Sequence, residues 1–235
     1  MKNCITAFIL IVCLQNIQAQ FSSSVYIETG ENYVSSGMYT DITGNISTKI
    51  KQWKFGMTTG LTFSEARQYR FNALGLDLSK ELKLKEFSFK GKFFYQWKPF
   101  SERIHEQNAG LLLAYEKNWF GIEMGLNTRI YNLTARVVSL NNYQYTTIWE
   151  PLNLMYKFTY FVPLSEKIHF RASITDYDTF IIQQETSPMI VTKLDFQLSQ
   201  SAKLNLGVGY LQSGLMNIRV NYFGYFIRGG VQWEL

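Results

Sequence analysis

The chain has 235 residues, a formal net charge of +5, 17% charged residues and 16% aromatic residues. Its mean hydropathy of −0.10 shows that apolar and polar residues are interleaved rather than grouped in blocks. After residue 19 no run of about 18 apolar residues occurs, which excludes a helical membrane protein. The lysines and arginines are spread along the chain instead of clustering with exposed aromatic residues, so we expect no nucleic-acid partner.

Residues 1–19 predict a cleaved signal peptide, which implies export. Lys2 supplies the positive n-region, residues 5–14 form the apolar h-region, and residues 17–19 form a plausible cleavage site before Gln20. This leader is too short to cross a membrane as a helix. The mature domain is therefore expected to span residues 20–235.

Both cysteines of the chain, Cys4 and Cys13, lie inside the leader. The mature chain thus has no thiol, and it can form neither a disulfide nor a cysteine metal site. A lipoprotein that retains Cys13 is disfavoured, because Val12 is bulky where a small residue is expected. No cofactor or metal site is expected from any other motif.

The mature chain alternates apolar and polar residues with a period of two. In residues 38–50 one face carries Met38, Ile42 and Ile46, while the other carries Asp41 and Asn45. Side chains of a strand point to alternate faces, so this pattern predicts a long two-faced strand. The same reasoning predicts about twelve strands, with 10 to 14 compatible with the pattern, at 22–29, 38–50, 53–64, 69–79, 87–97, 108–115, 119–131, 152–162, 168–176, 188–198, 203–211 and 220–233.

The predicted connections alternate between short and long. The short ones are 51–52, 80–86, 116–118, 163–167 and 199–202, and the long ones include 98–107, 132–151 and 177–187. Short turns at one end and longer loops at the other are typical of an outer-membrane barrel, with both chain ends on the short-turn, periplasmic side.

Proline and tryptophan placement agree with this arrangement. The four prolines are expected in connections or at the first residue of a strand, where no ladder hydrogen bond is lost; they are Pro99, Pro151, Pro163 and Pro188. The five tryptophans fall at or near predicted strand ends, where they would form two interfacial girdles; they are Trp53, Trp97, Trp119, Trp149 and Trp233. For any single Trp, an ordinary core anchor is the alternative.

We therefore predict an all-β fold, an antiparallel up-and-down transmembrane β-barrel formed by the whole mature chain. With its leader, its alternating strands and a last strand that alternates from Tyr225 to Trp233, the chain resembles the small, porin-like outer-membrane β-barrels of Gram-negative bacteria. The resemblance implies outer-membrane lipid as surroundings and recognition of the last strand by the barrel insertion machinery. Here Glu234 and Leu235 follow the aromatic residue that usually ends such chains. Because the class includes pores, enzymes, adhesins and assembly factors, it does not choose a function.

Catalysis has one candidate pair. His169 shares a predicted strand face with Ser173, but the two lie four residues apart, about 13 Å at the usual rise, so they cannot touch. The other histidine, His105, lies in a predicted loop. A lumen histidine is therefore the simpler interpretation than an outer-membrane lipid hydrolase, and we expect no enzyme activity.

The polar faces supply the candidate pore residues. If the apolar faces meet lipid, the inward side chains that are candidates for lining a pore are Lys49, Lys54, Lys90, Lys92, Glu123, Arg129, Lys157, His169, Arg171, Lys193, Asp195 and Arg228. Large inward side chains that would constrict it are Phe94, Met155, Phe161 and Phe226. The lumen is mixed but leans basic, and a salt-bridge network that only satisfies the interior is the alternative.

Lys49 and Lys54 are a special case. A two-residue turn at 51–52 would place them directly opposite each other at the periplasmic mouth. Opposed like charges cost stability unless water, an anion or a carboxylate compensates, so compensation is expected there.

We predict a monomeric barrel that acts as a narrow passive channel for small solutes, since twelve strands lie between filled and open barrels. The alternative is a non-conducting accessory subunit of an envelope complex, with outer loops such as 177–187 contacting a protein partner. That loop contains an apolar cluster formed by Phe180, Ile181 and Ile182. A secreted soluble β-sandwich is disfavoured by the strand lengths.

Overall fold

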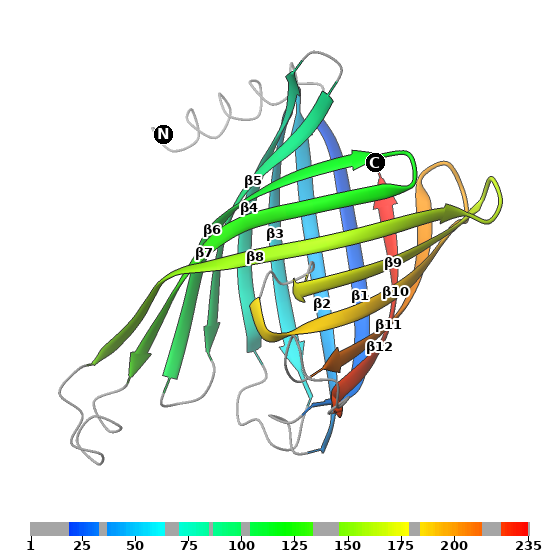
Figure 1. The fold of residues 1–235 in the computed structure, drawn as a ribbon. Coiled ribbons are helices and arrows are strands. Elements are labelled where there is room, and N and C mark those ends of the chain that lie inside the picture. The colour runs from blue at the N-terminus through cyan, green and yellow to red at the C-terminus, as the bar shows by residue number, and fades with distance from the viewer. Residues whose placement is uncertain are drawn as a thin grey trace, which may run out of the picture.

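The computed structural model is a single closed barrel of twelve antiparallel strands (Figure 1). It describes residues 19–32, 37–63, 71–84, 87–99, 104–133, 146–178, 184–212 and 222–234. The strands are β1 (Ala19–Asn32), β2 (Gly37–Ile50), β3 (Trp53–Thr62), β4 (Phe71–Leu84), β5 (Phe87–Pro99), β6 (Ile104–Lys117), β7 (Phe120–Leu133), β8 (Thr147–Pro163), β9 (Ile168–Tyr177), β10 (Gln184–Gln197), β11 (Ala202–Gln212) and β12 (Tyr222–Glu234). Each strand pairs with its neighbours in the chain, and β1 pairs with β12 to close the barrel.

The predicted fold class, strand number and alternation of connections are confirmed. The start of β1 and the end of β12 lie at the same end of the barrel as the short turns (Figure 1). The longer connections join the strands at the opposite end. The part of the chain that is described contains no helix long and apolar enough to cross a membrane. The leader up to residue 18 and the apolar cluster at 180–182 lie outside the described residues.

The register of the β2–β3 hairpin is the one expected from sequence. Ile50 lies opposite Trp53 and Lys49 opposite Lys54, joined by the two-residue turn Lys51-Gln52. Lys51 adopts a φ of 57°, a left-handed conformation that a tight hairpin turn requires and that a lysine adopts less readily than glycine or asparagine.

Several strands are longer than predicted. β4 continues to Leu84 and β5 to Pro99, while β6 begins at Ile104 and β8 at Thr147. The predicted connections 80–86, 98–107 and 132–151 are therefore too long. Charged and polar residues such as Lys80, Lys98 and Glu106 interrupt the apolar alternation at these strand ends, so the pattern does not predict the pairing there.

All four prolines lie in strands rather than in connections or at a first residue, and Pro99 and Pro163 are the last residues of β5 and β8. Pro151 lies inside β8 and Pro188 inside β10. Both coincide with breaks in register, between Asn127 and Arg129 on the strand facing β8, and between Gln184 and Met189 within β10. A bulge leaves a residue out of the ladder, so a proline there removes no hydrogen bond.

The outer surface of the barrel is apolar along its length. Its most exposed apolar side chains include Ile46 (66% exposed), Leu111 (63%) and Leu152 (71%). The tryptophans lie at the strand ends, as expected: Trp53, Trp119 and Trp233 at the short-turn end, and Trp97 and Trp149 at the other. Next to Trp119 the aromatic rings of Phe87, Phe89, Tyr115, Phe120 and Tyr160 form a continuous outer cluster.

A lysine on this outer face should be far more costly than one in the lumen. Leu111 points outward near the middle of β6, and Leu111→Lys should lower the free energy of unfolding by about 2–4 kcal/mol, the cost of a cation at the bilayer midplane. The matched control is Ala114→Lys on the same strand, which faces inward opposite Glu123. Urea unfolding in lipid vesicles measures both, and an equal or larger cost at position 114 would reverse the assigned faces.

Candidate functional site

The inward face of the barrel is polar and closely packed. On β3, Thr58 and Thr62 are buried while the alternate residues Met57 and Leu61 are exposed, which is the reverse of a soluble barrel. Inward polar residues that are almost fully buried include Gln96, Glu106, Asn108, Asn127 and Asn205. The lumen is thus the part of the molecule where chemistry can be placed.

Two connected cavities lie on the side of the lumen formed by β1–β5. The first, which we call the inner cavity, has a volume of about 200 Å³ and is lined by Lys54, Lys90, Lys92 and Phe94 among others. The second, the mouth cavity, has a volume of about 480 Å³ and contains Lys49 at the short-turn end. Residues that line both cavities join them into one space; they are Ser22, Ser47, Lys54, Ser79, Lys90 and Gln232.

Two further cavities lie on the opposite side. One, of about 110 Å³, is lined by several of the predicted pore residues, namely Lys157, Phe161, Arg171, Lys193, Phe226 and Arg228. The other, of about 650 Å³, opens at the short turns and is lined by Phe161, His169, Arg171 and Asp195 among others. Tyr26, which is 5% exposed, lines both the inner cavity and the 110 Å³ cavity and so stands between the two sides.

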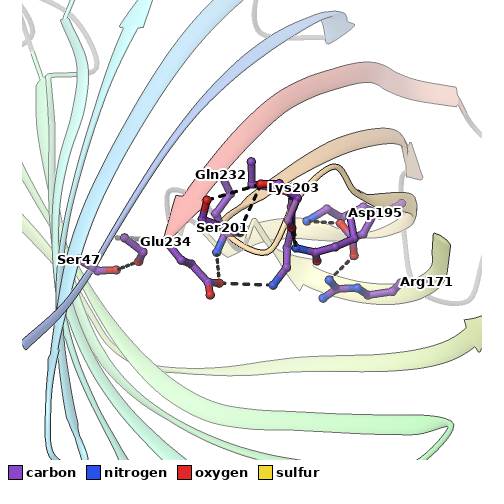
Figure 2. A network of polar contacts seen from close by, with 12 residues as sticks. Ser47, Arg171, Asp195, Ser201, Lys203, Gln232 and Glu234 are labelled. Atoms are coloured by element: carbon purple, nitrogen blue, oxygen red, sulfur yellow. Dashed lines mark hydrogen bonds and ion pairs between the residues drawn. The ribbon is translucent and has the colours of Figure 1, made fainter. Parts of the chain in front are cut away.

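Most lumen charges are paired. The ion pairs are Lys92–Asp77 (4.0 Å), Lys157–Glu123 (2.7 Å), Arg129–Glu106 (2.9 Å), Lys193–Asp195 (3.1 Å), Arg171–Asp195, and Arg228 with both Glu28 and Asp178. Figure 2 shows Arg171 reaching Asp195 beside a second group around Lys203 and Glu234, which pair at 3.3 Å. Pairing offsets the cost of holding these charges away from bulk water.

An apolar cluster, which we call the waist, lies in the lumen beside β5, β6, β8 and β9. Phe94, Leu112, Met155 and Tyr177 form one buried cluster, with exposed fractions of 1%, 4%, 0% and 1%. Tyr177 is held there by its hydroxyl, which donates a hydrogen bond to Glu123 at 2.8 Å.

Glycines make room for the waist. A Cβ atom at Gly110 would lie 2.7 Å from the ring of Phe94, and one at Gly125 would lie 2.7 Å from Cδ2 of Leu112. These distances are shorter than carbon atoms tolerate, so the side chains of the waist can lie against the wall only because β6 and β7 have glycine there.

The structure brings the predicted constriction residues together only in part. Phe94 and Met155 meet in the waist, whereas Phe226 belongs to a second buried cluster with Met189 and Leu211. Phe161 is half-buried next to Gly121 and lines the cavity of about 650 Å³. Whether all sixteen candidates line a conducting path stays a prediction.

Some residues of the lumen were missed from sequence. Glu106 and Tyr177 fall in predicted connections, although Glu106 lies in β6 and Tyr177 ends β9. Leu112 could have been found, because it shares its alternation with Asn108 inside a predicted strand. Glu28 could have been found in the same way, because it follows Ser24 and Tyr26 on one face.

The histidines do not form a catalytic pair among the described residues. His169 is exposed and lines the cavity of about 650 Å³. Ser173 shares a hydrogen bond with Thr159 (3.0 Å) rather than with His169. His105, expected in a loop, lies in β6 and stacks on Trp97 with ring centroids 5.8 Å apart. Within the same residues no group of His, Cys, Asp and Glu is arranged to hold a metal ion.

Solved structures share this architecture. The KdgM porin in complex with disordered oligogalacturonate has a TM-score of 0.55 at 10% identity, with 90% of this chain and 98% of that chain covered. The NanC porin gives 0.53 at 12% identity over 90% of this chain and 100% of that one. The chain is porin-like in fold.

A third similar structure comes from another functional class. The translocator domain of the autotransporter NalP from Neisseria meningitidis gives a TM-score of 0.50 at 12% identity, with 99% of this chain and 95% of that chain covered. No protein-family model matches the chain, and no curated relative does either. At these identities the similarity concerns the fold, so function has to be argued from the lumen itself.

The buried pair Arg129–Glu106 should be the most costly ion pair to break. The side chain of Glu106 is 1% exposed and accepts hydrogen bonds from Arg129 and from Asn108 (2.9 Å). Arg129→Gln should therefore destabilise the barrel by about 3–5 kcal/mol, since it leaves a buried carboxylate without a cation. Lys203→Gln, which breaks the exposed pair with Glu234, should cost at most about 1 kcal/mol. Urea unfolding of both variants tests this, and similar costs would contradict the assigned burial.

Proposed function

We propose that this protein is an integral outer-membrane barrel that acts as a narrow passive channel for small hydrophilic solutes. The membrane location is supported by the outer surface, where large apolar side chains are exposed from one end of the strands to the other. A soluble protein rarely exposes an apolar surface of this extent, whereas the hydrocarbon of a bilayer requires it. The predicted leader and the porin-like fold agree with this location.

The observation that carries the channel proposal is the set of polar, lysine-rich cavities that reach into the lumen from the short-turn end. The mouth cavity narrows to the inner cavity, and both are bounded by hydroxyl and ammonium groups. Such a lining suits hydrated solutes, and the waist beyond it limits their size.

The packed waist also favours the second candidate, a non-conducting barrel that serves as an accessory subunit. The side chains of Phe94, Met155 and Tyr177 are almost fully buried, and most lumen charges are paired. A barrel of this kind needs no current to be stable. Its envelope partner would bind the outer loops, of which residues 179–183 are not described.

Conductance through the waist separates the two candidates. Single-channel recordings of the refolded mature chain should show small unitary currents, and Phe94→Ala should raise them at least about twofold by removing a large side chain from the lumen. Leu113→Ala, on the lipid-facing side of β6, is the matched control and should leave the current unchanged. Absence of current in both the wild type and Phe94→Ala would favour the accessory barrel.

The channel should prefer anions. Lys49, Lys54, Lys90 and Lys92 line the connected cavities against Asp77, Glu81 and Glu234. The electrostatic field of these lysines should favour anion entry. The preference should weaken as salt is added, because the screening length is about 10 Å at 0.1 M salt and becomes shorter at higher concentrations. Reversal potentials in a salt gradient should therefore indicate anion preference, which Lys49→Glu combined with Lys54→Glu should reverse. Cation preference in the wild type would contradict this.

A further inference from the structure

The carboxylates of the mouth and inner cavities are all engaged by particular lysines. Glu81 pairs with Lys49 at 3.4 Å, although Lys90 is its direct partner in the β4–β5 ladder. Asp77 lies 4.0 Å from Lys92, and Glu234 pairs with Lys203 at 3.3 Å (Figure 2). Three carboxylates are thus assigned to three lysines.

Lys54 and Lys90 are the remaining lysines of the two cavities. Among the described residues neither has a carboxylate within ion-pair distance, and both line the two connected cavities. Lys54 also lies directly opposite Lys49; Lys90 and Lys49 repel its ammonium, while the more distant carboxylates Asp77 and Glu234 attract it without pairing with it. Two like charges that line one shared cavity favour an anion between them.

Hydroxyl donors surround the same space. Ser22 and Ser47 share one hydrogen bond at 2.6 Å, so one of their two hydroxyl hydrogens is used between them and the other remains for a ligand. Ser79 is 3% exposed, lies opposite both Lys54 and Lys92 in the ladders, and lines both cavities. Hydroxyls beside two ammonium groups are the donors that an oxyanion requires.

The space is large enough for a small organic anion. The mouth cavity, at about 480 Å³, falls within the range of roughly 300–1,000 Å³ typical of small-molecule pockets. It is open at the short-turn end, where Gln20 and Gln52 form part of its wall. A ligand can therefore reach Lys54 and Lys90 without crossing the waist.

We propose that Lys54 and Lys90, with the hydroxyls of Ser22, Ser47 and Ser79, form a binding site for the carboxylate or phosphate group of a small solute. This deepens the proposed function, because it assigns the anion preference of the channel to one site in its periplasmic half. The site does not depend on conduction, since it lies on the open side of the waist.

Calorimetric titration of the folded mature chain in detergent tests the site, with inorganic phosphate and acetate in separate arms. The wild type should bind at least one of the two, and the arm that binds identifies the group. Lys54→Gln combined with Lys90→Gln should weaken binding by at least about tenfold, because two charge-assisted contacts are lost. Lys54→Arg combined with Lys90→Arg should retain it.

The matched control removes the same charge elsewhere. Lys83→Gln combined with Lys167→Gln changes two exposed lysines outside both cavities and should leave the affinity within about twofold. Migration on unboiled gels verifies that every variant is folded. An equal loss in the control pair, or no binding of either anion by the wild type, would overturn the site.

The same preparations separate this inference from the proposed function. Anion currents through a wild type that binds neither probe would overturn the site and leave the channel standing. Lysine-dependent binding without any current would overturn the channel and leave the site standing.

Discussion

The constraint on which the rest of the structure depends is that backbone donors and acceptors inside a bilayer must pair within the protein. β1 and β12 meet from Ser22 opposite Glu234 to Asn32 opposite Gly224, so the sheet has no free edge between them. The two prolines inside strands lie at breaks in register, where the ladder has no hydrogen bond for them to remove. Closure also fixes the side-chain faces, because a strand shifted by one residue would present its lysines to lipid.

Closure of the barrel also determines the electrostatics of the lumen. Side chains from both sides of a narrow barrel are forced together, and a charge there is costly unless it finds a partner. Glu106, Glu123 and Asp195 each meet a cation, and Tyr177 adds a hydrogen bond to Glu123. Lys54 and Lys90 have no carboxylate within ion-pair distance in the described part of the chain, and they mark the place where an external anion would complete the network.

The sequence predicted the architecture because apolar and polar residues alternate along the strands, as a barrel with an apolar outer face and a polar lumen requires. Residues 38–50 and the β2–β3 register could be predicted from the pattern alone, including the opposition of Lys49 and Lys54 and the need to compensate it, which Glu81 meets for Lys49. Strand ends cannot be predicted in this way, because the alternation is interrupted by charged residues there; Glu106 therefore falls in a predicted connection although it lies in β6.

The alternation of apolar and polar residues also does not predict which side chains pack together in the lumen. Alternation states that Phe94 and Met155 point inward, but their contact with Leu112 depends on strand tilt and on Gly125 lying between Leu112 and Met155 in the ladders. The pairing of lysines with carboxylates likewise depends on the three-dimensional structure. Glu81 pairs with Lys49, although Lys90 lies directly opposite it in the ladder.

The central claim, a water-accessible polar lumen inside a lipid-facing apolar wall, can be measured on one strand. The predicted mature chain has no cysteine, so single cysteines can be introduced along β3 at Lys54, Phe55, Met57 and Thr58. In lipid vesicles a membrane-impermeant thiol reagent applied from the short-turn side should label positions 54 and 58 and spare 55 and 57. Labelling of 55 and 57 with protection of 54 and 58, or no alternation at all, would contradict the account.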